Sequence, residues 1–278
     1  MNTENNNEYL FHYTSIDVLA LILKHHTIRL NPLSKLDDLQ EQKTADVENL
    51  GHFVFVSSWT SDDNESIPMW KMYTSPASGV RIKLRKNPFA WNNTSGKDIT
   101  EKTGMPVISN SAGDVLLTSF LDLSELLSKG YFSPQAISGD ILKRVEYTND
   151  ISLLEPKVLE KTGDQLSLGI GRMGINKSEY WEFQKEWRYI MSFIPLNLCS
   201  SPEIIAQDFG VTISKLSLGI ATPPFPYYDL TIEPEAFSEM EITCSPKITD
   251  GNRIIVDNLV QTYNSTAQIC DSALLGKL

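Results

Sequence analysis

The sequence predicts an α+β fold in which a mostly antiparallel sheet is flanked by helices. Five to eight segments carry strand patterns, and several follow one another at hairpin spacing. One amphipathic helix stands out early in the chain. Long helices do not alternate regularly with the strands, which disfavours a doubly wound parallel sheet. We expect a single domain over residues 1–278, with a core at about 9–260 and a peripheral insertion near 87–139.

The first half of the chain opens with an aromatic strand pattern at 9–13 that leads into a helix at 16–25. Thr14 and Ser15 precede this helix and are suitable N-cap residues, and its apolar residues recur at helical spacing. The other elements expected here are an extended piece at 27–30, a loop with a short surface helix at 34–48, strands at 52–59 and 80–84, and a helix at 67–73.

Three cations, Arg81, Lys83 and Arg85, alternate along the last of these strands and share one face. A solvated edge strand is the simpler interpretation of this pattern. The alternative is a strip of positive charge that faces a phosphate.

The second half of the chain has weaker patterns. A loop starts near residue 87, and only one helix is indicated before Gly139. The expected elements are a helix near 121–129, a strand at 141–148, helices at 151–168 and 203–209, and strands at 213–220, 240–244 and 253–256. The polar tail from residue 262 onward is expected to be loosely held.

Composition narrows the functional classes. The net charge of −11 argues against binding nucleic acid or an anionic membrane over the whole surface, although a local basic site remains compatible with it. The three cysteines lie outside any metal-binding or redox motif, which indicates reduced thiols. The polar start of the chain lacks a secretory signal pattern, and no apolar run approaches about 20 residues. We therefore expect a cytoplasmic protein without a membrane partner.

The stretch 179–190 combines charged and aromatic residues and turns into a strand pattern. From Glu186 onward, Trp187 and Tyr189 alternate with Arg188, so the aromatic residues would face the core and the charged residues the opposite side. An ion pair on a half-exposed strand is the simplest interpretation. The alternative is an active-site glutamate that aromatic packing holds in place.

Familiar catalytic motifs do not account for these residues. The four histidines include no i,i+4 pair and no HExxH motif, and GxSxG is absent. The acidic residues Asp37, Asp38 and Glu41 are compatible with an acid-only magnesium site, but charge-rich loops are usually just solvated. The pair Gly169 and Gly171 lacks the preceding strand and the third glycine of a dinucleotide-binding loop.

Several short motifs follow one another in a specific order over about residues 9–220. They are Phe11-His12-Tyr13-Thr14-Ser15, Leu36-Asp37-Asp38-Leu39-Gln40-Glu41, Phe55-Val56-Ser57-Ser58-Trp59, Met69-Trp70-Lys71-Met72-Tyr73, Gly79-Val80-Arg81-Ile82, Val145-Glu146-Tyr147, and Lys177 through Trp181 to Lys185-Glu186-Trp187-Arg188. Together they resemble the bacterial domain-of-unknown-function family 2971. The chain departs from that pattern at Gln184-Lys185, where a more acidic run is common, and at Ser58-Trp59, where Ser-x-acid is usual.

The strand that ends in His-Tyr-Thr, with the helix and short strand after it, is also distantly similar to the start of ADP-ribosyltransferases. These include DNA-modifying toxins and RNA 2′-phosphotransferases. The resemblance implies a split β-sandwich, with NAD as the substrate and no metal. It implies that His12 donates to a ribose hydroxyl, that Tyr73 or Tyr13 stacks on nicotinamide, and that Glu186 is the catalytic carboxylate. The residues implied around the cofactor are Tyr13, Thr14, Ser57 and Arg188.

The implied chemistry agrees with these residue types. Loss of nicotinamide leaves an oxocarbenium-like ribose, which a carboxylate stabilises, while an aromatic ring can hold the leaving group. The acidic net charge is no obstacle, because a few local donors such as Arg29 or Arg188 can meet one pyrophosphate.

The resemblance thus implies a protein that transfers ADP-ribose to a macromolecule, or hydrolyses NAD, as a toxin or phage-defence effector. The acceptor would be nucleic acid or protein, and an antidote protein is a further implied partner. Two alternatives stay open. One is a metal-dependent nuclease that uses Asp37, Asp38, Glu182 and Glu186. The other is a non-catalytic sensor or interaction module in a defence system.

Overall fold

A nine-stranded sheet forms the centre of the protein, as shown by a computed structural model that describes residues 8–104, 116–163, 165–198, 202–223 and 225–277. The strand order along its main path is β13-β2-β3-β1-β4-β14-β15, and β12 pairs with both β3 and β7. Its strands are β1 (Tyr9–Ser15), β2 (Thr27–Pro32), β3 (Val54–Thr60), β4 (Gly79–Arg85), β7 (Leu142–Arg144), β12 (Glu186–Ser192), β13 (Tyr228–Thr231), β14 (Glu241–Cys244) and β15 (Gln268–Cys270).

The pairing in this sheet is antiparallel except between β14 and β15. The predicted class, a mostly antiparallel sheet with flanking helices, is therefore confirmed. The short two-stranded sheets beside it combine β5 (Asn92–Ser95) with β6 (Leu116–Ser119), β9 (Leu159–Thr162) with β10 (Gln165–Leu168), and β8 (Glu146–Thr148) with β11 (Asn176–Ser178).

The sheet divides into two wings between β1 and β3. In the first wing, β1 pairs with β4 along all seven of its residues, and β14 and β15 follow. In the second wing, β3 pairs along its whole length with β12. Between the wings, the backbone register is a single pair, Phe11 with Thr60. Beyond that pair β1 and β3 are not in register with each other, and the His12 side chain reaches the Ser58 carbonyl oxygen across the split between them.

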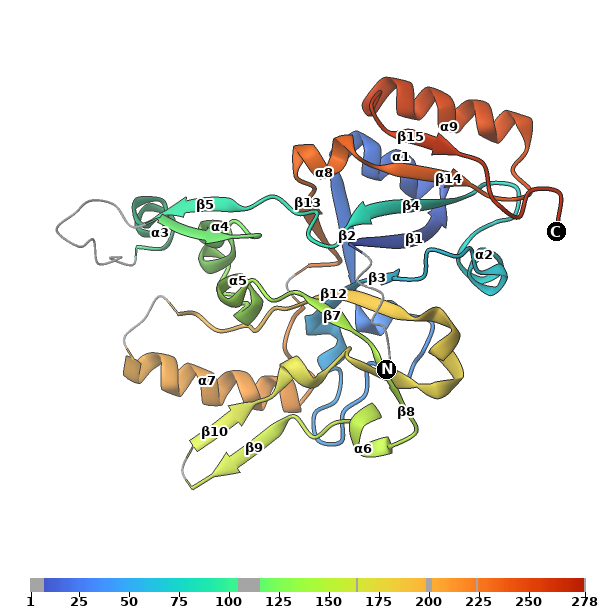
Figure 1. Ribbon diagram of the computed structural model, residues 1–278. Coiled ribbons are helices and arrows are strands. Elements are labelled where there is room, and N and C mark those ends of the chain that lie inside the picture. The colour runs from blue at the N-terminus through green and yellow to red at the C-terminus, as the bar shows by residue number, and fades with distance from the viewer. Residues whose placement is uncertain (1–7, 105–115, 164, 199–201, 224, 278) are drawn as a thin grey trace.

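The α-helices lie around the main sheet and around the short sheets beside it (Figure 1). They are α1 (Ile16–His25), α2 (Ile67–Tyr73), α3 (Gly96–Thr103), α4 (Leu123–Ser128), α5 (Pro134–Ser138), α6 (Ile151–Leu154), α7 (Pro202–Ser217), α8 (Pro234–Ser238) and α9 (Asp250–Tyr263). Ser15 caps α1 by accepting a hydrogen bond from the backbone N–H of Val18, as its position in the sequence predicts. Helix α9 lies beside α1 (Figure 1). No helix of the described residues has the length and apolarity needed to cross a membrane.

Two hydrophobic clusters lie on opposite faces of the second wing. The larger one contains Tyr189 and Met191 of β12 and extends to Leu10 and Ile82 in the first wing. The smaller one contains Ile190 of β12, together with neighbours from η2 (Leu50–Phe53) and the loop around it. Strand β12 is therefore buried on both faces. The alternation predicted for Trp187 and Tyr189 is present, but the face of Arg188 is not solvated.

Several predicted elements were wrong. Residues 151–168 form α6 and the β9–β10 hairpin instead of one helix, and 213–220 and 253–256 lie mostly or wholly in helices α7 and α9 instead of strands. Short apolar runs such as these fit either period, and length and packing decide between them. The expected surface helix within 34–48 is absent. Only the 3₁₀ turn η1 (Leu33–Lys35) overlaps it, and the rest is turns and loop.

Two further expectations near the sheet edges were also wrong. Strand β4 lies between β1 and β14, so it is not an edge, and Arg81 is buried with its guanidinium over the ring of Phe11. The tail is not loosely held, because β15 joins the sheet parallel to β14. Strand β5 and helices α3, α4 and α5 lie to one side of the main sheet (Figure 1).

Candidate functional site

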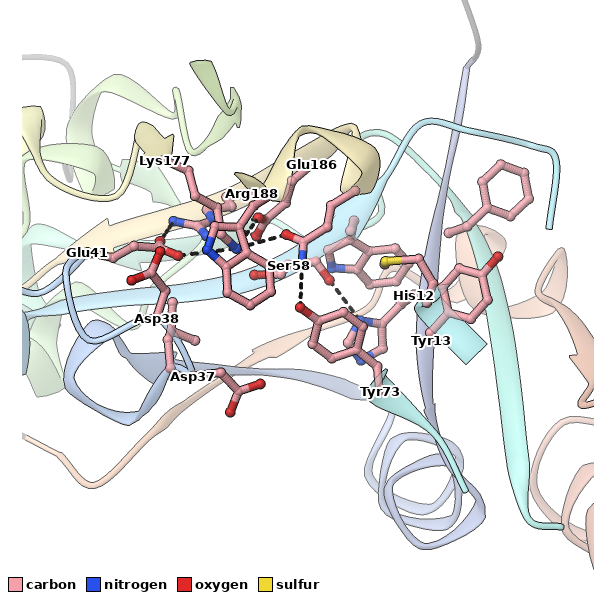
Figure 2. Close-up of a pocket in the computed structure, with 16 residues that line it drawn as sticks. His12, Tyr13, Asp37, Asp38, Glu41, Ser58, Tyr73, Lys177, Glu186 and Arg188 are labelled. Carbon is pink, nitrogen blue, oxygen red and sulfur yellow. Dashed lines mark hydrogen bonds and ion pairs between the residues drawn. The ribbon is translucent and has the colours of Figure 1, made fainter. Parts of the chain in front are cut away.

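A cavity of about 100 Å³ lies at the split between the two wings. Its apolar wall includes rings from β1, β3 and η4 (Glu179–Gln184) and Met69 of α2. Its polar wall includes Lys177, Gln184, Glu186 and Arg188 (Figure 2). A concave space with aromatic walls and a few converging polar groups is typical of a small-ligand site.

A second cavity of about 350 Å³ adjoins the first. The two share five lining residues, which are His12, Leu36, Asp37, Ser58 and Tyr73. The second cavity is also lined by the basic residues His25, Arg29 and Lys35 and by Asp229, with which Arg29 makes a bidentate ion pair. The two cavities therefore meet at a junction bordered by His12 and Tyr73.

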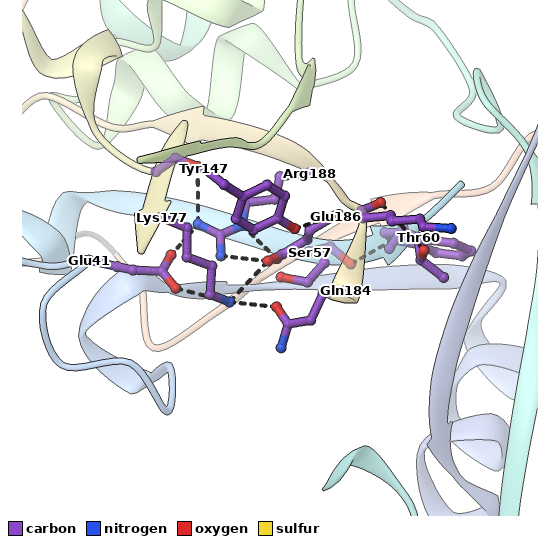
Figure 3. A network of polar contacts seen from close by, with 12 residues as sticks. Glu41, Ser57, Thr60, Tyr147, Lys177, Gln184, Glu186 and Arg188 are labelled. Carbon is purple, nitrogen blue, oxygen red and sulfur yellow. Dashed lines mark hydrogen bonds and ion pairs between the residues drawn. The ribbon is translucent and has the colours of Figure 1, made fainter. Parts of the chain in front are cut away.

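Four buried charged residues form the floor of the first cavity. Arg188 donates from Nε to Glu186 Oε1 at 2.6 Å and from Nη2 to Glu186 Oε2 at 3.0 Å, and it also contacts Glu41 (Figure 3). Lys177 Nζ donates to Glu186 Oε2 at 3.0 Å and lies 3.2 Å from Glu41 Oε1, where it contributes charge rather than a hydrogen bond. Two acids and two bases balance each other, so the cluster is neutral overall.

The protonation states in this cluster follow from burial and charge. Burial alone would raise the pKa of Glu186, but the positive charges of Arg188 and Lys177 outweigh it and lower this pKa to about 2. Burial alone would lower the pKa of Arg188, but Glu186 and Glu41 raise it further above its ordinary value. Glu186 is therefore a carboxylate at neutral pH, and its oxygens accept hydrogen bonds from Arg188 and Lys177.

The local backbone positions the side chains of Lys177, Glu186 and Arg188 at the first cavity. Lys185 adopts a left-handed conformation with φ of 45°, which ends η4 and turns the chain into β12. The backbone N–H of Glu186 then donates to the Tyr147 hydroxyl at 2.8 Å. Lys177 lies on β11, which pairs with β8, and Arg188 Nη1 also donates to the Gly174 carbonyl at 3.0 Å. Segments that are far apart in the sequence thus contribute to one network of ion pairs, formed by Glu41, Lys177, Glu186 and Arg188.

A chain of hydrogen bonds connects this network to Tyr73. Lys177 Nζ donates to Gln184 Oε1 at 2.8 Å, and Gln184 Nε2 donates to the Tyr73 hydroxyl. Burial raises the pKa of Tyr73 to about 12, with the negative charges of Glu186 and Asp37 adding to the effect. Tyr73 therefore keeps its proton at neutral pH.

His12 bridges the split between the wings. Its Nδ1 lies 2.8 Å from the Ser58 carbonyl oxygen. Its ring is tilted relative to that of Trp59, with 5.1 Å between the two ring centroids. Burial lowers the pKa of His12, so the ring is neutral at pH 7. A carbonyl oxygen can only accept, so Nδ1 carries the proton and Nε2 is an acceptor. His12 therefore offers a ligand an acceptor at Nε2, which differs from the donor that the resemblance implies.

The structure brings the three predicted catalytic residues together, because His12, Tyr73 and Glu186 all line the first cavity. Tyr13 also lines it, but its hydroxyl accepts from the Ser66 N–H at 3.0 Å and its ring packs edge-on against Trp70.

The remaining candidates are distributed between the two cavities. Thr14 and Ser57 line the second cavity, while Arg188 lines the first. The four acids of the nuclease alternative do not converge, since Asp37, Asp38 and Glu186 line the first cavity and the exposed Glu182 lies outside both. In the part of the chain that the structure describes, no group of three or more His, Cys, Asp or Glu residues is arranged to hold a metal ion.

Sequence reasoning missed Lys177, Gln184 and Ser58 as site residues. Lys177 lies in a motif segment, but a lysine there predicts a surface charge, and its burial between two carboxylates depends on the fold. Gln184 carries no local signal, because its role comes from Lys177 on one side and Tyr73 on the other.

A scan against protein-family models and searches of curated proteins and of solved structures find no match to this chain.

Proposed function

We propose that the protein binds NAD across the two cavities and cleaves the bond between nicotinamide and ribose. ADP-ribose is transferred to a macromolecule or to water. The observation that carries this proposal is the convergence of His12, Tyr73 and Glu186 on the first cavity. This cavity adjoins the larger second cavity, and His12 and Tyr73 line both. The divergence of β1 and β3 supports an ADP-ribosyltransferase-like split sheet as the scaffold.

The shapes of the cavities support a dinucleotide as the ligand. The smaller cavity has aromatic walls and a size suited to one substituted ring, so it takes the nicotinamide. The larger cavity takes the rest of the molecule, and Arg29 and Lys35 on its wall provide positive charge for the pyrophosphate.

The charges around the smaller cavity support the cleavage step. The bond from ribose C1′ to the ring nitrogen breaks, and its electron pair remains on nicotinamide, which leaves neutral. The positive charge that develops on the ribose is stabilised by the nearby carboxylate of Glu186, which its low pKa keeps ionised. A nucleophile of the acceptor, or water, then bonds to C1′ and releases a proton.

The test is release of nicotinamide from labelled NAD, and transfer of the label to components of a cell lysate. Glu186→Gln should abolish both, since it removes the negative charge from the cavity. Glu182→Gln is the matched control, because Glu182 is exposed and outside both cavities. Thermal unfolding of each variant shows whether a loss of activity reflects unfolding. Equal activity in wild type and a folded Glu186→Gln variant contradicts the mechanism.

A second candidate function is a non-catalytic NAD sensor. The observation that favours it is the hydrogen bonding of Glu186, because both carboxylate oxygens already accept from Arg188 and one also accepts from Lys177. A sensor binds NAD without releasing nicotinamide. In that case wild type and Glu186→Gln both bind NAD, and neither releases nicotinamide. For both candidates the proposed setting is a toxin or phage-defence system, in which an antidote protein is a proposed partner.

A further inference from the structure

The side chain of Gln184 has a defined orientation between two partners. Lys177 can only donate hydrogen bonds, so the Gln184 atom 2.8 Å from its Nζ must be the amide oxygen. The amide nitrogen consequently faces Tyr73 and donates to its hydroxyl oxygen. Gln184 is buried, as is Lys177, so this orientation is fixed by the ion-pair network behind it.

This orientation determines what Tyr73 can do. Because its oxygen already accepts a hydrogen bond from Gln184, its own O–H is left to donate elsewhere. Tyr73 lines both cavities, so that donation can serve a ligand lying at their junction.

His12 supplies the complementary group at the same junction. Its Nδ1–H is committed to the Ser58 carbonyl, which leaves Nε2 as an acceptor. His12 also lines both cavities. The two residues that border the junction thus carry one free donor, the Tyr73 hydroxyl, and one free acceptor, His12 Nε2.

We propose that Gln184 is a positioning residue that directs the Tyr73 hydroxyl proton into the junction, where Tyr73 and His12 together bind a vicinal diol. This inference rests on the proposed function and assigns the diol to the ribose between nicotinamide and pyrophosphate. That ribose lies at the junction when the ring occupies the smaller cavity. One of its hydroxyls donates to His12 Nε2, and the other accepts from Tyr73. Tyr73 is then a hydrogen-bond donor to the sugar rather than a platform for the ring.

The experiment measures dissociation constants by calorimetry with carbocyclic NAD, whose ribose oxygen is replaced by carbon so that the cleavable bond is inert. Three companion ligands are used. Two lack the 2′-hydroxyl or the 3′-hydroxyl of the sugar ring between nicotinamide and pyrophosphate, and the third has nicotinic acid in place of nicotinamide. Wild type should bind each deoxy form about tenfold more weakly than the parent, because each lacks one hydrogen bond to the protein.

Two variants test the role of Gln184. Gln184→Glu keeps the size of the side chain and its contact with Lys177, but a carboxylate accepts the Tyr73 proton and turns it away from the junction. Tyr73→Phe removes the donor itself. Each variant should weaken binding of the parent ligand about tenfold. One of the two deoxy ligands lacks the hydroxyl that pairs with Tyr73. Each variant should bind that ligand with the same affinity as wild type does. Glu182→Gln is the control and should bind all ligands as wild type does.

The other outcomes separate the two proposals. If wild type binds the parent and both deoxy forms equally, the diol assignment is overturned while NAD binding stands. If only the nicotinic acid form binds more weakly than the parent, the residues at the junction recognise the carboxamide instead of the diol. The diol assignment is again overturned. If Gln184→Glu weakens all ligands equally, Gln184 has a purely structural role. If folded wild type does not bind carbocyclic NAD, the proposed function fails as well.

Discussion

Arg188 shows how strongly the environment of one residue depends on the fold. The alternation around it predicts a surface ion pair, yet its side chain has no exposed area and contacts two buried carboxylates. Such a buried network contributes little net stability compared with apolar residues of similar shape, because desolvation offsets the attraction. Removing one partner is much more costly, since the others remain buried without compensation.

We predict that Arg188→Met lowers the free energy of unfolding by roughly 3–5 kcal/mol, because it leaves Glu41 and Glu186 buried with only Lys177 between them. Urea denaturation measures this loss. Arg172→Met is the control, since Arg172 pairs with Glu160 at the surface and its loss should cost about 1 kcal/mol or less. Similar costs for the two substitutions would mean that the buried network is not formed.

The low pKa of Glu186 predicts a specific dependence of stability on pH. This pKa is about 2 in the folded protein, compared with an ordinary value of 4.5, so the unfolded state takes up the proton first as pH falls. The stabilisation from ionised Glu186 is complete above pH 4.5 and is lost between pH 4.5 and pH 2. Urea denaturation at pH 7, 4.5 and 3 should show this loss. Glu186→Gln should have a shallower decline over that range, and an identical decline would argue against the assigned pKa.

At the scale of elements, α2 is positioned by a segment from the far end of the chain. Glu65, just before the helix, accepts from Trp70 Nε1 at 2.9 Å, from the Ala273 N–H at 2.6 Å and from the Ser272 hydroxyl. Leu274 packs against the cluster that contains Trp70. Because α2 carries Met69 and Tyr73 into the first cavity, the segment 272–274 supports the site from behind.

We predict that Glu65→Ala loosens this segment without unfolding the sheet. The substitution leaves the buried Trp70 indole N–H without its acceptor, at a cost of about 1–3 kcal/mol, and it also removes the acceptor of the exposed Ala273 N–H. Hydrogen exchange measured by mass spectrometry should become faster at 272–277 and in α2, while β12 stays protected. Glu239→Ala, at an exposed acid on the surface, should leave exchange unchanged. Unchanged exchange in Glu65→Ala would show that the segment is held by other contacts.

At the scale of the whole molecule, two wings that share a single backbone register pair are joined by side chains. The larger hydrophobic cluster contains Leu10 and Ile82 from the first wing and Trp59 and Tyr189 from the second. Helix α1 adds Leu19 and Leu23 to the same cluster. Neither wing can unfold without exposing the apolar surface of the other, so the wings should be one cooperative unit.

We predict a single thermal unfolding transition whose calorimetric enthalpy equals its van't Hoff enthalpy. Carbocyclic NAD at about 100 times its dissociation constant should stabilise the protein by about 2.7 kcal/mol and move that one transition upward. Two separate transitions, of which the ligand moves only one, would show that the wings are independent.

The fold was largely predictable where local signals were strong. The helix at 16–25 and the helix at 67–73 agree with the structure to the residue. An N-cap and a helical apolar face mark the first, and Pro68 in the first turn and a helical apolar face mark the second. The strand at 253–256 was wrong, since Val256 and Val260 are buried one helical turn apart and a four-residue window does not contain that period. Of the candidate site, the three residues with implied catalytic roles, His12, Tyr73 and Glu186, line one cavity, while the roles themselves remain predictions.

The sequence by itself determined the class of the fold and the bounds of the helices at 16–25 and 67–73, because these depend on neighbours within a few positions. Only the tertiary structure decided that Glu186 and Arg188 are buried, that Lys177 and Glu41 complete their network, and that Gln184 orients Tyr73. These contacts join residues up to 147 positions apart. Their protonation states and hydrogen-bond directions arise from burial and from partners that the fold alone brings together.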